Sequence, residues 1–124
     1  MNLAEKLAIA KAWIGLQHAG DQADERHRDF WAHERLRDLT EHDPETAWDL
    51  IITILRQDNS DTIVANLGAG PLEDLLGTHG DTFIQRVEEL AKRDESFRKV
   101  VGCVWQNEIP NAIWMRVKAI SSQH

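Results

Sequence analysis

Cysteine is nearly absent from this chain, and Cys103, the single one, cannot form an internal disulfide. We expect it to be a buried, inert thiol. Long apolar runs are absent too, since each spans only a few residues, against about 20 needed to cross a bilayer. The start, Met1 to Lys6, lacks the basic residues and apolar stretch of a signal peptide. These absences predict a cytoplasmic protein with no membrane partner.

Motifs for catalysis or cofactor binding are also lacking. The few serines have no neighbouring base to activate them as nucleophiles. Gly68-Ala69-Gly70 is accompanied by neither the lysine nor the hydroxyl of a phosphate-binding loop. No run alternates between apolar and polar residues, so no strand is expected. The sequence therefore predicts no cofactor and no catalytic residue.

A metal site is suggested by histidines that stand near acidic residues. The residues concerned are His27, Asp29, His33, Glu34, Asp38 and His42. His33 and Asp29 share a helical face, but His27 and His33 point in different directions, so no three-ligand set forms locally. Exposed histidines on a charged helix are the favoured interpretation, and no metal is predicted.

Basic residues are in the minority. The chain carries 21 acidic and 14 basic side chains, for a formal charge of -7. Long-range electrostatics therefore repels nucleic-acid phosphates and anionic lipid. We expect a protein partner, basic or neutral, rather than nucleic acid or membrane.

Helical periodicity is what the chain does have. Two blocks match at an offset of 36 residues: Ala47, Ile51, Ile54, Leu55, Asp58, Ser60 and Val64 recur as Phe83, Val87, Leu90, Ala91, Asp94, Ser96 and Val100. Such a repeat is typical of stacked helix pairs. Because the connections are short, the pattern predicts an all-α domain over residues 1–124. It would be an antiparallel bundle or a short HEAT-like stack of six to seven helices.

Capping residues, glycines and prolines mark the helix ends. The expected helices cover residues 2–20, 31–42, 43–56, 59–67, 81–93, 97–105 and 113–120. In the first, Leu3, Leu7, Ala10 and Ile14 fall at helical spacing and are expected to form its apolar side. The third is apolar around most of its circumference and is expected at the centre of the fold.

The glycines at 68–70 are expected to interrupt the chain before Pro71 opens a short helical turn, which Gly77 to Gly80 ends. Glu73 and Asp74 fall in its first turn, where carboxylates satisfy free amides and complement the helix dipole. The functional alternative is that the pair binds a cation or an arginine of a partner. His79 is expected to cap a helix C-terminus.

Tryptophans are the large anchors of this chain. Trp48 lies on the apolar central helix and is expected in the core. Trp31, Trp105 and Trp114 lie near helix ends beside polar residues, where an indole can remain at the surface. Trp105 opens the polar corner at residues 105–108, which is where an exposed anchor for a partner is most expected.

A distinctive run, Gly-Pro-Leu-Glu-Asp-Leu-Leu, occupies residues 70–76. It is accompanied by Ala47-Trp48, Ala65-Asn66-Leu67, His79-Gly80, Val87-Glu88, Phe97-Arg98 and Val104-Trp105. Together these residues resemble DUF6869, a family of small uncharacterised bacterial proteins, over about residues 31–117. The resemblance implies a helical fold and a bacterial origin, and no established activity. Gly68 stands where the family would have alanine, a change expected to loosen the helix by about 1 kcal/mol.

The combination predicts a non-enzymatic intracellular scaffold that binds another protein, with an antitoxin or immunity role as one form of it. The predicted partner-binding surface is Glu73, Asp74, Trp105 and Asn107. A homodimer formed through the apolar end helices is left open by the sequence.

Two other functions remain as alternatives. One is an acidic inhibitor that mimics nucleic acid, which is weakened because arginines interleave with the acids of residues 21–43. The other is an enzyme with a metal or carboxylate site. It would need a deep pocket in which Glu34, Glu73, Asp74 or a histidine converge.

Overall fold

All regular structure in the computed structural model, which describes residues 1–121, is helical. The helices are α1 (Leu3–His18), α2 (Phe30–His42), α3 (Pro44–Gln57), α4 (Asp61–Leu67), α5 (Glu73–Arg93), α6 (Glu95–Val101) and α7 (Asn111–Ser121). A 3-10 turn (Gly20–Gln22) follows α1, and a π-helical stretch (Gly68–Leu72), called the π segment below, joins α4 to α5. The described residues contain no strand, which confirms the all-α prediction. None of their helices is both long and apolar enough to cross a membrane.

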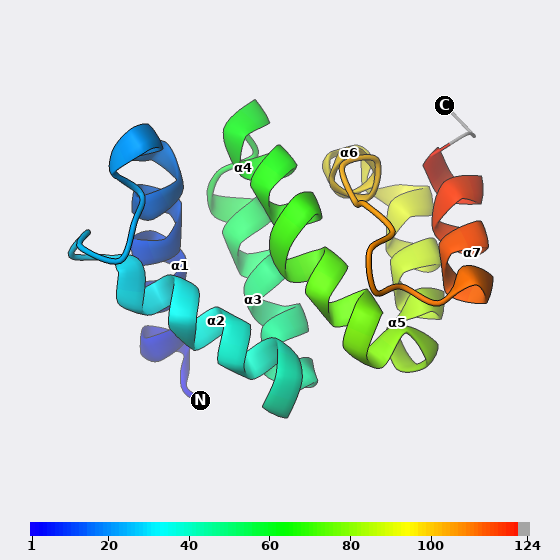
Figure 1. Cartoon of the computed structure of the whole chain (residues 1–124), viewed down its shortest axis with the longest axis horizontal. Helices are drawn as coiled ribbons and strands as arrows, with labels where there is room; N and C mark the ends of the chain where they lie inside the picture. The colour runs from blue at the N-terminus through cyan, green and yellow to red at the C-terminus, as the bar shows by residue number, and fades with distance from the viewer. Residues whose placement is uncertain (122–124) are drawn as a thin grey trace.

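The helices follow one another along the long axis of the molecule, with α1 at one end and α7 at the other (Figure 1). α3 packs against α1, α2, α4 and α5, while α5 packs against α2, α3, α6 and α7. Buried side chains from all seven α-helices form one continuous hydrophobic core that extends from Ile9 to Ile120. α3 thus lies inside the array, as its apolar circumference predicts.

Two of the predicted helix starts have the expected caps. Asn2 Oδ1 accepts a hydrogen bond from the Glu5 N–H at 2.8 Å. At the start of α3, Asp43 Oδ2 accepts one from the Thr46 hydroxyl at 2.8 Å, and Pro44 occupies the first turn. The Asn2 contact, and a second one from the Thr46 backbone N–H to Asp43 Oδ1 at 3.4 Å, satisfy N–H groups that the first helical turn leaves unpaired.

The matching positions of the near-repeat have similar surroundings in the structure. Its eight apolar positions in α3 and α5 are all buried. Asp58 and Asp94 occupy equivalent corners, where each accepts a backbone N–H at the start of the next helix. The corners also contact each other, because Arg56 donates to Asp94 at 2.6 Å. The two repeat-related helix pairs, α3–α4 and α5–α6, thus contact each other.

The glycines at 68–70 do not interrupt the helix, contrary to the sequence prediction. Leu67, Gly68 and Leu72 all have helical backbone angles, so α4, the π segment and the start of α5 are continuous. The wider π turn accommodates Pro71, whose ring and missing N–H would disrupt a regular α-helix.

Gly68 allows a close approach rather than loosening the helix. A Cβ at this position would lie 2.7 Å from the Cβ of Cys103, and closer still to the carbonyl oxygen of Val100. Alanine would therefore push the π segment away from α6. The expectation that Gly68 is a weakness is wrong, because the packing here has no room for a side chain.

α5 bends sharply at His79, whose φ of -132° and ψ of 33° are not helical. Residues 73–78 run toward the bend and residues 80–93 return from it (Figure 1), which agrees with the break predicted between Gly77 and Gly80. His79 Nε2 lies 3.1 Å from the carbonyl oxygen of Glu41. The ring thus contacts a carbonyl in the last turn of α2, which is a helix C-terminus, as expected for this histidine.

The predicted apolar side of α1 is only half right. Ala10 is buried, but Leu3 is 69% exposed and Leu7 is 40% exposed. The buried residues are Ile9, Ala10, Ala12, Trp13 and Leu16. Apolar residues are distributed all around this helix, so spacing alone could not identify the side that packs.

Candidate functional site

The four predicted surface residues do not form one patch. Glu73 joins Trp105 and Asn107 at the loop between α6 and α7, whereas the next residue, Asp74, lines a pocket. Successive helical residues point about 100° apart, which accounts for this division. The Glu73 N–H donates to the Gly70 carbonyl, because the helix is continuous there. The predicted capping of free amides by this acidic pair is therefore wrong.

The loop of residues 102–110, called the Trp105 corner below, is held by one carboxylate. The Trp105 backbone N–H donates to Glu73 Oε1 at 3.1 Å, and Asn107 Nδ2 donates to Glu73 Oε2 at 2.6 Å. Asn107 has a φ of 36°, a left-handed conformation that asparagine tolerates. Gln106 Nε2 donates to the Ile109 carbonyl at 3.2 Å. Both Glu73 oxygens are thus engaged in fixing the loop.

The tryptophans differ in exposure. Trp105 is 69% exposed. The sixth helix was expected to include it, but α6 ends at Val101, and Trp105 lies in the loop that follows. Trp31 is 46% exposed. Trp48, expected in the core, is half-buried and packs against the rings of Phe83 and Phe97, with centroids 5.8 and 5.6 Å away. Trp105 is therefore a large apolar group held at the surface.

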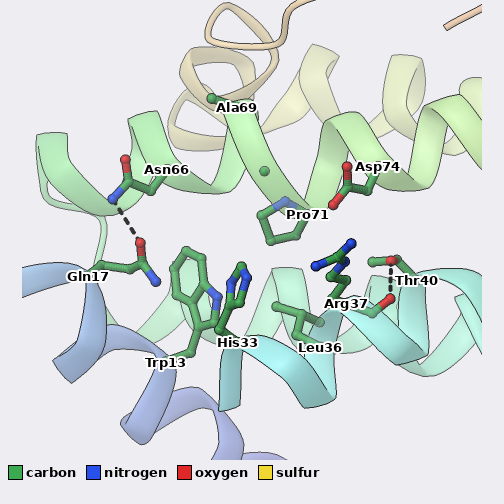
Figure 2. A pocket seen from close by; sticks show the side chains of 11 residues that line it. Trp13, Gln17, His33, Leu36, Arg37, Thr40, Asn66, Ala69, Pro71 and Asp74 are labelled. Carbon is green, nitrogen blue, oxygen red and sulfur yellow. Dashed lines mark hydrogen bonds between the residues drawn. The ribbon is translucent and has the colours of Figure 1, made fainter. Parts of the chain in front are cut away.

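Asp74 faces a pocket of about 250 Å³, called the Trp13 pocket below. Figure 2 shows its walls: α1 and α2 on one side, and α4, the π segment and the start of α5 on the other. The lining residues are Trp13, Gln17, His33, Leu36, Arg37, Thr40, Asn66, Ala69, Gly70, Pro71 and Asp74. The innermost of these, such as Trp13, Leu36 and Pro71, are buried, while Arg37 and Asp74 are exposed at the rim.

Charges at this rim are not neutralised by direct contact. No ion pair or hydrogen bond engages the Arg37 guanidinium among residues 1–121, although it is close enough to Asp74 to influence its titration. Desolvation and the neighbouring Glu73 raise the pKa of Asp74 above its usual value, while Arg37 and His33 oppose the shift. Asp74 thus lies in a partly enclosed place without a bonded counter-ion.

Trp13 also has an unused donor. It is 2% exposed, and none of the described residues accepts a hydrogen bond from its indole N–H. No buried side-chain nitrogen or oxygen of residues 1–121 lacks a partner, so this N–H must open onto accessible space. In Figure 2 the nitrogen side of the ring faces the interior of the pocket beside His33.

Sequence reasoning missed this pocket, because it considered Asp74 together with Glu73 and left Trp13 and Arg37 unassigned. These residues lie far apart in the chain and meet only when α1 packs across α2 and α4. One local signal was present. Pro71 does not fit the interior of a regular α-helix, so a helix that continues through it is distorted there, and π-bulges are frequent at functional sites.

Histidines of the charged region do not converge. His27 Nδ1 accepts the Asp29 N–H at 3.0 Å, and His42 Nε2 lies 3.8 Å from Asp38. Within residues 1–121, no three His, Cys, Asp or Glu side chains are placed to hold a metal ion. Cys103 is half-buried rather than fully buried, and burial raises the pKa of its thiol, which disfavours the reactive thiolate.

Comparisons with known proteins give one finding about ancestry. No curated protein and no solved structure matches this chain. Residues 19–124 match the model of a family of unknown function, DUF6869. The match begins just after α1, so Trp13 and Gln17 lie outside it while the rest of the pocket lies within it. Because the match covers nearly the whole chain, the protein belongs to the DUF6869 family.

Proposed function

We propose that this chain is a cytoplasmic, non-enzymatic module that binds a basic protein through the Trp105 corner. The observation that carries the proposal is the exposure of Trp105, 69%, on a backbone held by Glu73. A large indole at the surface can bury much apolar area in a partner and donate its N–H at the same time.

Preorganisation supports the same interpretation. The loop is fixed by hydrogen bonds that the Trp105 backbone, Asn107 and Gln106 donate. A loop that is already ordered loses little conformational entropy on binding, so more of the contact energy contributes to affinity. Glu73 acts here as a positioning residue, because both of its carboxylate oxygens are engaged with the loop.

Charge supports a basic partner. The formal charge of -7 steers the chain toward positive surfaces. Mimicry of nucleic acid is less favoured, because Glu45, Glu88 and Asp94 are each paired with an arginine of another helix. An antitoxin or immunity role, in which a small acidic protein covers a basic enzyme, is the form of the proposal that this charge supports best.

The test is comparative affinity capture from a lysate of the organism that encodes the chain. Wild type is compared with Trp105→Ala, and Trp31→Ala is the matched control, since Trp31 is also exposed but lies on α2. A basic protein retained by wild type and by Trp31→Ala, released by moderate salt and lost with Trp105→Ala, is the expected result.

The proposal would be overturned if Trp105→Ala retained every protein that wild type retains. It would equally fail if the protein lost with Trp105→Ala were acidic. Light scattering of the purified chain adds a check on self-association: a dimer that dissociates on Trp105→Ala substitution would make a second copy the occupant, in place of a basic partner.

A further inference from the structure

The Trp13 pocket is a second feature, separate from the Trp105 corner, and its residues are arranged in two parts. Leu36 and Pro71 give it a buried apolar interior. Arg37 and Asp74, of opposite charge, stand at the exposed rim. Sites for small molecules have this composition, with an apolar lining and a few polar groups that fix orientation.

The two rim charges are neighbours without being bonded. Arg37 influences the titration of Asp74, but their charged atoms form no ion pair. A guanidinium offers a planar set of N–H donors suited to a carboxylate, and a carboxylate suits an ammonium. One ligand that carries both groups on the same carbon atom would satisfy both side chains at once.

Other charge types fit less well. A simple anion would meet Arg37 but also the carboxylate of Asp74, with Glu73 next to it. A simple cation would meet the reverse conflict at Arg37. The volume of about 250 Å³ lies below that of usual nucleotide or drug-sized sites, yet far exceeds the space of one water or ion.

We propose that the Trp13 pocket binds a free α-amino acid with an apolar side chain. The α-carboxylate lies against Arg37, and the α-ammonium lies against Asp74. The side chain packs inward on Leu36 and Pro71. Gly70 has no atom within 4 Å of where a Cβ would be, so the π segment leaves this space open.

The test is an NMR titration that follows the indole ¹⁵N–¹H signals, with that of Trp13 assigned by its loss in Trp13→Phe. The probes are L-leucine, L-methionine and L-phenylalanine. 4-Methylpentanoate, which lacks the ammonium of leucine, and 3-methylbutylamine, which lacks the carboxylate, complete the set. At least one amino acid should shift the Trp13 signal saturably, and each leucine analogue should bind about tenfold or more weakly than leucine.

Variants at the rim separate the two charges. Asp74→Asn should weaken amino-acid binding about tenfold while leaving 4-methylpentanoate unchanged or tighter, and Arg37→Gln should weaken both of these acids. Glu73→Gln is the matched control, since its carboxylate faces the Trp105 corner, and its amino-acid affinity should stay within about twofold of wild type.

Three results would overturn the proposal. One is the absence of any saturable shift of the Trp13 signal with the three amino acids. Another is equal affinity for 4-methylpentanoate and for leucine, which would indicate a site for simple organic acids. The third is an Asp74→Asn variant that is folded by circular dichroism and binds the amino acid as wild type does.

Discussion

Glu73 and Asp74 are adjacent in the chain and are used in opposite ways. Both oxygens of Glu73 accept hydrogen bonds, from the Trp105 backbone and from Asn107. The side chain of Asp74 has no bonded partner within residues 1–121, whereas its backbone carbonyl accepts from the Thr78 hydroxyl, and the pKa of the side chain is raised. On one side of the helix the chain uses a carboxylate to build a loop, and on the other it leaves a carboxylate at the edge of a pocket.

This difference indicates how structural and functional carboxylates can be distinguished in a protein of unknown function. A carboxylate whose hydrogen bonds are made within the fold contributes mainly to stability. A partly enclosed carboxylate without such bonds lowers the stability of the fold. Such groups cluster at functional sites, so ligand binding is the first role to test. Substitutions at Glu73 or at Asp74 alone change one side of the helix at a time.

The largest effect on stability should come from a substitution in the π segment, which directly precedes both Glu73 and Asp74. Gly68→Ala should lower the free energy of unfolding by about 2 kcal/mol, because its Cβ would overlap the α6 end at Val100 and Cys103. Urea unfolding followed by circular dichroism measures it. Gly70→Ala is the control, since its Cβ meets nothing within 4 Å. If both variants were equally stable, the close approach at Gly68 would be disproved.

A fully bonded carboxylate elsewhere sharpens the comparison. Hydrogen bonds from Ser60 and His18 lower the pKa of Asp58 from 3.8 to about 2. A carboxyl whose pKa is lower in the folded than in the unfolded state stabilises the fold at pH values above its unfolded-state pKa. This contribution is lost as the pH falls toward 2. Asp58→Asn should therefore cost about 1 kcal/mol at pH 7 after solvent screening. The difference in unfolding free energy between wild type and Asp58→Asn should narrow between about pH 4 and 2. A difference independent of pH would argue against a stabilising role of the Asp58 charge.

On the structural side of the helix, Glu73→Gln should cost about 1 kcal/mol, because one of the two accepting oxygens becomes a donor that faces another donor. Amide exchange should accelerate at residues 102–110 and not at α2. Unchanged exchange in this loop would show that Glu73 does not fix it.

On the pocket side, Asp74→Asn should change stability at pH 7 by less than about 0.5 kcal/mol, or raise it slightly. The pKa of Asp74 is raised in the fold by desolvation and by Glu73, so its protonation favours the folded state. Its stabilising contribution is present below the unfolded pKa and is lost as the pH rises through the folded one. Thermal unfolding of wild type and Asp74→Asn at pH 4 and pH 7 measures the direction of this pH dependence. A marked loss of stability in Asp74→Asn at pH 7 would contradict the prediction.

The smallest effect on stability should be that of Trp105→Ala, within about 0.5 kcal/mol of wild type, because the side chain is 69% exposed. Thermal unfolding checks this value. A large loss would mean that the indole supports the fold, and the same variant could then no longer report on partner binding.

The fold was largely predictable because its signals are local. Caps at Asn2 and Asp43, the break near His79 and the repeat-related Asp58 and Asp94 each depend on a few neighbouring residues. Continuity through Gly68 was not predictable. It depends on how closely α6 approaches, which is a tertiary property that glycine propensity does not contain.

The site was predictable only in part, for the same reason. The sequence predicted Glu73, Trp105 and Asn107 as residues of one surface, and the structure places these three together. It could not separate Asp74 from Glu73, since their directions depend on a helix that continues through Pro71. Nor could it find the pocket, because Trp13 and Arg37 meet Asp74 only in the folded chain.

The most direct test of this division is a single set of urea unfolding curves for wild type, Glu73→Gln and Asp74→Asn, with and without saturating L-leucine. A ligand that binds the folded state alone raises its stability. We predict that Glu73→Gln starts about 1 kcal/mol lower and still gains stability from the amino acid, whereas Asp74→Asn starts near wild type and gains almost none. Equal behaviour of the two variants, in starting stability and in response, would contradict the account.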